Sequence, residues 1–176
     1  MESLVSTKWA IDPSHSEIGF KVIHMMISSV KGHFKSFEAT VEATEDDFSD
    51  AKVKVSIDAD SIYTNNEDRD NHLKSDDFLN AEKYPKITFE STSFDGKKLV
   101  GDLTIRDITK QVELKVEHNG TAVDGYGQTK AGFEIRGEIN RKDFDLKWDQ
   151  VTEAGNVVVS DMVKLIIDAE FTKEEE

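Results

Sequence analysis

The side chains of this sequence best suited to acid–base chemistry or metal binding are its histidines. They are His15, His24, His33, His72 and His118. No two of them have the i, i+4 spacing that presents a pair of imidazoles on one helix face. If His15 and His24 lay on one long strand, they would be about 30 Å apart and could not share a metal ion. The sequence therefore predicts no metal site.

The other residue types give little evidence for a catalytic site. The chain has no Cys, which removes thiol nucleophiles, zinc–thiolate sites and iron–sulfur clusters. It also lacks a glycine-rich phosphate loop and the turn motif that exposes a catalytic serine. We expect that the protein is not an enzyme and carries no cofactor.

The charge balance limits the class of partner. Lys and Arg number 22 against 36 Asp and Glu, for a formal net charge of −14. Nucleic acid and anionic membrane surfaces are bound by clustered Lys and Arg. The charge therefore argues against both, and no nucleic-acid partner is expected. No segment reaches the roughly 18 apolar residues of a membrane span, so we predict no stable membrane insertion. Met1–Asp12 lacks the apolar segment of a signal peptide, which predicts a cytoplasmic protein.

The elements that must position any site are strands. Apolar residues recur at every second position, the pattern of a strand with one buried face. The alternating segments are residues 18–24, 53–59, 99–105, 112–116, 131–139 and 163–171. Two further strands, 28–43 and 86–94, are less regular. The apolar parity of the first switches between Phe34 and Phe37, which predicts a β-bulge near Lys35–Ser36.

The connections between these strands are short. Asp95–Gly96 and Asn119–Gly120 tolerate positive φ and predict hairpin turns, and Asp12–His15 predicts a turn held by side-chain hydrogen bonds. The polar segment 66–79 predicts a short helix at about residues 67–77. The fold class is all-β: eight antiparallel strands with one apolar face each favour an up-and-down barrel, which removes the sheet edges. A two-sheet sandwich is the alternative.

An eight-stranded barrel is either filled by its own side chains or holds one small ligand. Small residues predicted to point inward would leave space; these are Ala39, Ala59, Gly101, Ala131, Gly137 and Ala169. Phe20, Phe89, Phe133 and Phe171 would line a long apolar cavity. The alternative is that these rings simply pack the core.

Several short motifs, in order along the chain, resemble the YceI-like family. They are residues 9–16 (WAIDPSHS), 22–25 (VIHM), 32–34 (GHF), 69–78 (RDNHLKSDDF), 84–89 (YPKITF), 101–106 (GDLTIR) and 140–144 (NRKDF). The resemblance extends over about residues 8–171. The sequence departs from the family at Asp145, where Gly is usual and where Gly would adopt a tight turn more readily.

The resemblance implies a single lipocalin-like domain over residues 1–176, with its core at about 8–172. Family members bind long isoprenoid chains, such as polyprenyl lipids or quinone tails, inside an apolar tunnel. Many are exported to the periplasm, and some form dimers. The resemblance therefore implies an amphiphilic isoprenoid ligand and allows a homodimer.

The residues expected to contact that ligand point inward from the strands. They are Phe20, Val22, His24, Phe34, Phe89, Leu103, Phe133, Ile135, Leu165 and Phe171. Arg69, His72 and Arg141, from motifs outside the regular strands, are candidates for contact with a polar headgroup. Structural roles are the alternative, in which Arg69 pins the helix and Arg141 pairs with a carboxylate. Trp9 and Trp148 could each close an end of the barrel.

We therefore expect a protein that binds a polyisoprenoid lipid or isoprenoid quinone for transport, storage or sequestration. One alternative is an enzyme acting on a barrel-bound lipid or quinone, with His24 as the candidate titratable group. The other is a stress-related interaction scaffold without a ligand, which predicts an exposed apolar patch and no cavity.

Overall fold

The computed structural model describes residues 6–24, 27–44, 48–146 and 159–174, and strands dominate this part of the chain. The strands are β1 (Thr7–Ile11), β2 (Glu17–His24), β3 (Ser28–Phe34), β4 (Phe37–Ala43), β5 (Lys52–Asp58), β6 (Ile62–Tyr63), β7 (Lys86–Phe94), β8 (Lys98–Ile105), β9 (Ile108–Val123), β10 (Thr129–Asn140) and β11 (Met162–Lys173). One α-helix, α1 (Glu67–Lys74), and three 3-10 turns, η1 (Pro13–His15), η2 (Ala59–Ser61) and η3 (Arg141–Phe144), complete the described elements.

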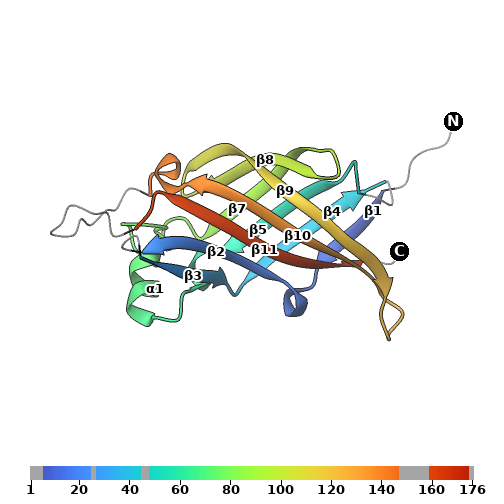
Figure 1. The fold of residues 1–176 in the computed structure, drawn as a ribbon, viewed down its shortest axis with the longest axis horizontal. Helices are drawn as coiled ribbons and strands as arrows, with labels where there is room; N and C mark the ends of the chain where they lie inside the picture. Colours follow the sequence, from blue (N-terminus) through green and yellow to red (C-terminus); the bar gives the residue numbers. More distant parts are fainter. Residues whose placement is uncertain (1–5, 25–26, 45–47, 147–158, 175–176) are drawn as a thin grey trace.

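The sheet closes on itself. Antiparallel pairing runs in the order β1–β4–β5–β7–β8–β9–β10–β11, and β1 pairs again with β11. Figure 1 shows these long strands wrapping around a common axis, with α1 at one end and both termini at the other. The structure thus confirms the predicted all-β, eight-stranded antiparallel barrel. The closing β1–β11 pair excludes the sandwich alternative, because a sandwich keeps its two sheets separate.

A second branch of pairing extends the wall at the end that carries α1. The first half of β11 pairs with β2, and its second half pairs with β1. β2 pairs in turn with β3, and β3 with β6. The predicted strand 28–43 is therefore two strands, β3 and β4, interrupted at Lys35–Ser36. The position of the predicted irregularity is right, but it is a break, because the two halves pair with different neighbours.

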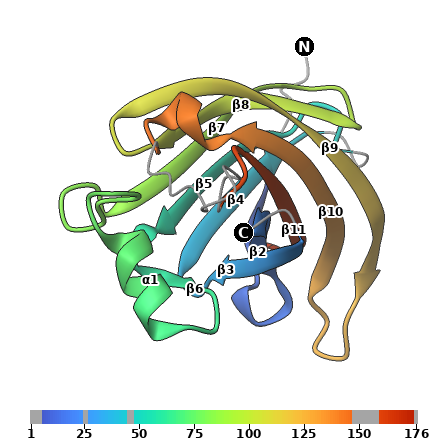
Figure 2. The same cartoon turned by 60° about the vertical axis from the view of Figure 1, so that its left-hand side comes forward.

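The predicted helix is present and shorter than the sequence suggested. It begins after Asn66, whose side chain accepts a hydrogen bond of 2.9 Å from the Arg69 amide, and ends at Lys74. Figure 2 shows α1 beside β6 and β3 at one end of the barrel. A polar helix of this length is marginal on its own, so contacts with the barrel must stabilise it.

Of the two predicted hairpin turns, one is confirmed and one is wrong. Asp95–Gly96 joins β7 to β8, with Gly96 at a φ of 97°. Asn119–Gly120 lies inside β9, where Gly120 faces Gly132 and His118 faces Phe133, so that Asn119 is an extra residue in a β-bulge. The chain turns instead at residues 124–128. Positive φ suits Gly at a bulge as well as at a turn.

The buried apolar side chains form two clusters. The larger one surrounds the barrel axis, and the smaller one, around Trp9, Phe48 and Phe133, lies at the end away from α1. Trp9, one of the two tryptophans that could close an end, is 7% exposed and packs in the smaller cluster, whereas Trp148 lies outside the described residues. Asp145 adopts the left-handed conformation (φ 63°) after η3, so the turn forms with Asp in the usual place of Gly. Among the described helices, none has the length and apolar character needed to span a membrane.

Candidate functional site

A cavity of about 550 Å³ runs inside the barrel. Its volume is within the range of roughly 300–1,000 Å³ typical of small-molecule sites. The strands supply its wall through the inward half of their alternating residues, for example Val53, Val55 and Ile57 of β5. The interior is therefore a space bounded by apolar side chains, and the barrel is not filled by them.

Most of the predicted ligand contacts lie on this wall. The lining residues include Phe20, Val22, His24, Phe34, Phe89, Leu103, Ile135, Leu165 and Phe171. Phe133 lies instead in the smaller cluster, edge-on to Phe48 at 5.1 Å between ring centroids. Its inward orientation was predicted correctly, but its position along the barrel axis places it beyond the cavity.

Further lining residues were missed as site residues, although the same alternation marks them as inward-facing. They include Ile18, Val30, Val53, Val55, Ile57, Ile87, Leu99, Val112, Leu114, Ile139, Val163 and Ile167. Leu73, Phe78 and Leu79, from the helix and the segment after it, also line the cavity. No strand periodicity could have found these three residues.

The small inward residues have two different uses. Ala39 and Ala169 line the cavity and leave room in it. A Cβ atom on Gly101 would lie 2.5 Å from Cζ of Phe89, and one on Gly137 would lie 2.4 Å from Cδ2 of Leu114. The expectation that these two glycines open space for a ligand is therefore wrong: their space is taken by neighbouring side chains.

The cavity is closed at the end away from α1. Trp9 and Phe48 pack at 5.1 Å between ring centroids, and His118 stacks on Phe133 at 4.7 Å. The lining residue Phe171 packs edge-on against Phe133 at 5.9 Å. This aromatic layer seals one end, which we call the closed end.

At the opposite end the lining becomes polar. Asp68, Arg69 and His72 of α1 contribute to the wall. Asp68 is exposed, and the His72 side chain is 37% exposed. Side chains that border the cavity and also meet solvent mark where the cavity reaches water, and we call this the open end.

Hydrogen bonds fix α1 against the segment that follows β6. Arg69 Nε donates to Oγ1 of Thr64 at 2.8 Å, and the guanidinium also donates to the Thr64 carbonyl. Asp70 is buried and accepts from the Thr64 amide at 2.8 Å. His72 Nε2 lies 2.8 Å from Oδ2 of Asp77. Arg69 therefore pins the helix, as the structural alternative proposed, and its contact with a headgroup stays a prediction.

Arg141 is the most buried of the three predicted headgroup candidates, with 3% exposure. Its guanidinium donates to the carbonyl of Leu146 at 2.6 Å and to that of Ser160 at 3.0 Å. One of its nitrogen atoms also lies 3.8 Å from the Asp161 carboxylate. Backbone carbonyls thus occupy much of its hydrogen-bonding capacity, which gives it a structural role at the open end.

His24 lines the cavity near the open end. This placement is the one that the enzymatic alternative requires. The other titratable residues of the described wall, Asp68, Arg69, His72 and Arg141, lie at the same end. Toward the closed end the described wall is apolar, so reactive groups are absent there.

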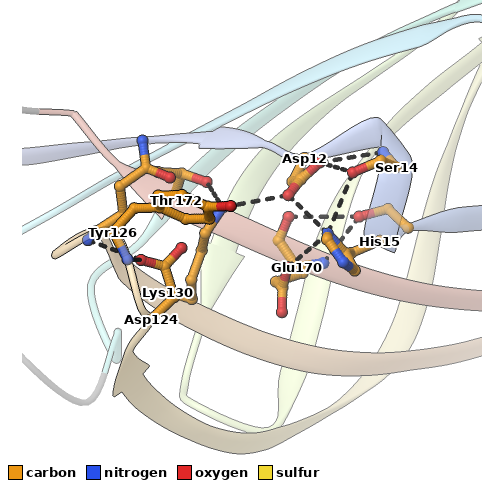
Figure 3. Close-up of polar contacts among 10 residues, drawn as sticks. Asp12, Ser14, His15, Asp124, Tyr126, Lys130, Glu170 and Thr172 are labelled. Carbon is orange, nitrogen blue, oxygen red and sulfur yellow. Dashed lines mark hydrogen bonds and ion pairs between the residues drawn. The ribbon is translucent and has the colours of Figure 1, made fainter.

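One cluster outside the cavity carries metal-ligand side chains. Ligand atoms of Asp12, His15 and Glu170 lie within 4.8 Å of one another (Figure 3). Lys130 Nζ, however, lies 3.2 Å from Oδ2 of Asp12 and already supplies a positive charge. The cluster therefore has its own counter-ion.

Hydrogen bonds explain the same cluster as the predicted turn. The Ser14 hydroxyl donates to Asp12 at 2.7 Å, and His15 Nδ1 lies 2.9 Å from Asp12 Oδ2. These contacts, the first above all, hold the pKa of Asp12 well below its ordinary value. The Asp12 hydrogen bond and the Glu170 charge raise the pKa of His15. The network locks η1 between β1 and β2 against β11.

Comparisons with known proteins agree with this architecture. The model of the YceI-like domain family matches residues 9–171. A UPF0312 protein of Staphylococcus aureus strain N315 is 41% identical over 167 residues, covering 94% of this chain and 98% of that protein. The crystal structure of a Campylobacter jejuni YCEI protein is 35% identical, with a TM-score of 0.72 and 100% of both chains covered. A polyisoprenoid binding domain from Saccharophagus degradans, implicated in plant cell wall breakdown, has a TM-score of 0.66 at 14% identity, covering 98% of this chain and 100% of that one.

Proposed function

This chain belongs to the YceI-like domain family, and from that membership together with its cavity we propose that it binds a polyisoprenoid lipid or the tail of an isoprenoid quinone. The chain of the ligand lies in the barrel, with its polar group at the open end. The protein transports, stores or sequesters this ligand and does not transform it.

The cavity of about 550 Å³ is the observation that carries this proposal. Its wall is apolar except near α1, so it suits a long hydrocarbon chain with one polar end. Removing apolar surface from water stabilises a complex by roughly 25 cal/mol per Å². Such a ligand needs no charged partner inside the barrel. The Saccharophagus degradans domain, described as polyisoprenoid-binding, supports the same ligand class through its shared fold.

Chemistry along the chain of the ligand is disfavoured because the titratable groups of the described wall gather at the open end. An enzyme acting along the chain of a lipid would need such groups beside the reacting carbon atoms. His24 alone supplies no nucleophile–base pair of the kind that covalent catalysis uses.

Native mass spectrometry of the full chain purified from its own host tests the proposal. We expect a bound mass that solvent extraction releases as an isoprenoid lipid or quinone, at up to one molecule per chain. Ile135→Trp, which adds a large ring to the cavity wall, should lower the bound fraction. Its matched control, Glu134→Trp, alters the exposed face of the same strand and should retain the ligand.

Two results would contradict the proposal. One is a protein that is empty when purified and takes up no added geranylgeraniol, a C20 isoprenoid alcohol. The other is equal ligand loss in both tryptophan variants with their folds intact by circular dichroism, since binding would then not depend on the cavity.

A further inference from the structure

The outer face of the barrel carries a row of three lysines on adjacent strands. Lys164 of β11 faces Lys21 of β2, and Lys21 faces Lys31 of β3 in the strand register. Like charges directly opposite one another destabilise a sheet, so this row has a cost in the free protein. Glu138 of β10 is the next residue across the sheet, opposite Lys164. Among the described residues, no carboxylate forms an ion pair with any of these three lysines.

Exposed apolar side chains adjoin this row. The large apolar residues of the described chain that remain exposed include Ile23 (40%), Ile27 (84%) and Met162 (41%). Ile23 lies two residues beyond Lys21 on the same face of β2, and Met162 lies two residues before Lys164 on β11. Ile27 follows in the connection to β3. We call these six residues, Lys21, Lys31, Lys164, Ile23, Ile27 and Met162, the basic corner.

The basic corner is the outer side of the open end. Side chains alternate across a strand, so the inward neighbours of Ile23 and Met162 are Val22, His24 and Val163, which line the cavity. Val159, another lining residue, forms an isolated β-bridge with His24. A surface that bound to the basic corner would therefore lie beside the place where the cavity meets solvent.

From this juxtaposition we propose that the basic corner docks the protein on an anionic lipid membrane, with the lysines at the headgroups and the three apolar side chains in the interfacial layer. The inference rests on the proposed function, because it supplies the route by which a membrane-resident isoprenoid enters the barrel. Peripheral membrane binding uses this combination of apolar area and basic charge.

The net charge of −14 does not prevent such docking. At physiological ionic strength the Debye length is about 8 Å, so charges on distant parts of the barrel are screened from a membrane at the basic corner. The acids nearest the row are Glu138, opposite Lys164, and Asp161, which precedes β11 and already pairs with Lys142 at 3.2 Å. With Glu138 counted, the three lysines still leave a local excess of positive charge. The sequence-level exclusion of anionic membrane surfaces considered the total charge and not its distribution.

Flotation of the full chain with phosphatidylglycerol–phosphatidylcholine vesicles tests the docking. We expect binding that rises with the phosphatidylglycerol fraction and falls with salt. Lys21→Gln, Lys31→Gln and Lys164→Gln together should lower the partition coefficient by about fivefold per lysine. Ile23→Ser, Ile27→Ser and Met162→Ser together should lower it at every salt concentration.

Two control variants make comparable changes on other parts of the surface, three lysines in one and two apolar residues in the other. Lys97→Gln, Lys110→Gln and Lys115→Gln remove the same charge from exposed positions around β8 and β9. Val123→Ser and Tyr126→Ser remove exposed apolar side chains from the opposite end of the barrel. Neither control should change the partition coefficient by more than about twofold, a free-energy difference of about 0.4 kcal/mol.

Geranylgeraniol binding without vesicles separates this inference from the proposed function. Loss of vesicle binding in the basic-corner variants, with alcohol binding retained, supports the docking. If the wild-type protein binds the alcohol but ignores anionic vesicles, or if the controls weaken vesicle binding equally, the docking is wrong and the binding function stands. If the protein binds vesicles through the basic corner but takes up no isoprenoid, the docking holds and the proposed function fails. Binding to an acidic protein without vesicle binding also overturns the docking.

Discussion

Arg141 shows how one residue type can serve either a ligand or the fold. Its sequence motif lies outside the regular strands, which made it a candidate for contact with a headgroup. In the structure, its guanidinium donates to the carbonyls of Leu146 and Ser160, near the two ends of the segment between η3 and β11. Buried carbonyls left without donors are costly, so the hydrogen bonds of this side chain stabilise the fold.

Replacement of Arg141 by Met should therefore destabilise the protein by about 2–4 kcal/mol, because buried acceptors lose their donors. Urea denaturation followed by circular dichroism measures this change. The matched control is Arg136→Met, which removes an exposed arginine with hydrogen bonds to Ile135 and Ile167. Arg136 also forms an exposed ion pair with Asp168, and exposed ion pairs contribute only about 0–1 kcal/mol. Equal losses in the two variants would contradict a structural role specific to Arg141.

Arg69 and His72 are less buried than Arg141. The sequence placed both in one polar segment, and the structure places both at the open end. Their hydrogen bonds to Thr64 and Asp77 could not be predicted, because they depend on how α1 docks on the barrel. Residue type alone does not distinguish a side chain that fixes a helix by hydrogen bonds from one that contacts a ligand.

At the scale of the elements, two glycines leave room for side chains of the neighbouring strands. Gly101 and Gly137 allow Phe89 and Leu114 of the neighbouring strands to cross over them. An added methyl group meets different obstacles at the two positions. At Gly101 it would lie 2.6 Å from the backbone carbonyl of Glu90, whereas at Gly137 the one close atom is the tip of the Leu114 side chain.

We therefore expect Gly101→Ala to cost about 1–3 kcal/mol through overpacking, since a strand backbone cannot move aside. Gly137→Ala should cost less, because a leucine tip can change rotamer and Ala reduces the entropy of the unfolded chain. Thermal unfolding of the two variants under one set of conditions provides the comparison. A Gly137→Ala variant that is as unstable as Gly101→Ala would refute this account of the packing.

The β9–β10 hairpin shows where element prediction reaches its limit. Asn119–Gly120 has the composition of a two-residue turn, yet β9 continues through it to Val123. Opposite it, Gly132 pairs with Gly120 and Phe133 with His118. The choice between turn and bulge depends on the length of the partner strand, and this information lies outside the dipeptide.

At the scale of the whole molecule, the distance between the closed end and α1 sets how long a ligand can be. Ala39 lines the cavity and also belongs to the cluster at the closed end. Ala39→Leu would occupy the deepest part of the cavity. We expect geranylgeraniol, a C20 alcohol, to lose about tenfold in affinity, the equivalent of about two buried methylenes. Geraniol, a C10 alcohol, should be little affected.

Displacement of a fluorescent probe such as 1-aminoanthracene measures both affinities. The control is Thr40→Leu, which adds a similar side chain at the exposed position next along β4 and should leave both alcohols unchanged. Equal losses for the two alcohols in Ala39→Leu would show that the ligand chain does not extend to the closed end.

The sequence by itself determined most of the longer strands, the faces they bury and the helix position, because alternation with period two and the loss of that pattern at 66–79 are local properties. It did not predict the short strands β1 and β6. It also determined which inward residues are available to form a wall. The tertiary structure decided that the sheet closes into a barrel and which end of the cavity stays open. The β1–β11 pair made a barrel of the sheet, and the aromatic layer around Trp9 and Phe133 sealed one end. The lysine row at the basic corner likewise exists only through strand register. These features join residues far apart in the chain, and pairwise distances between such residues are set by closure and register, which no local pattern encodes.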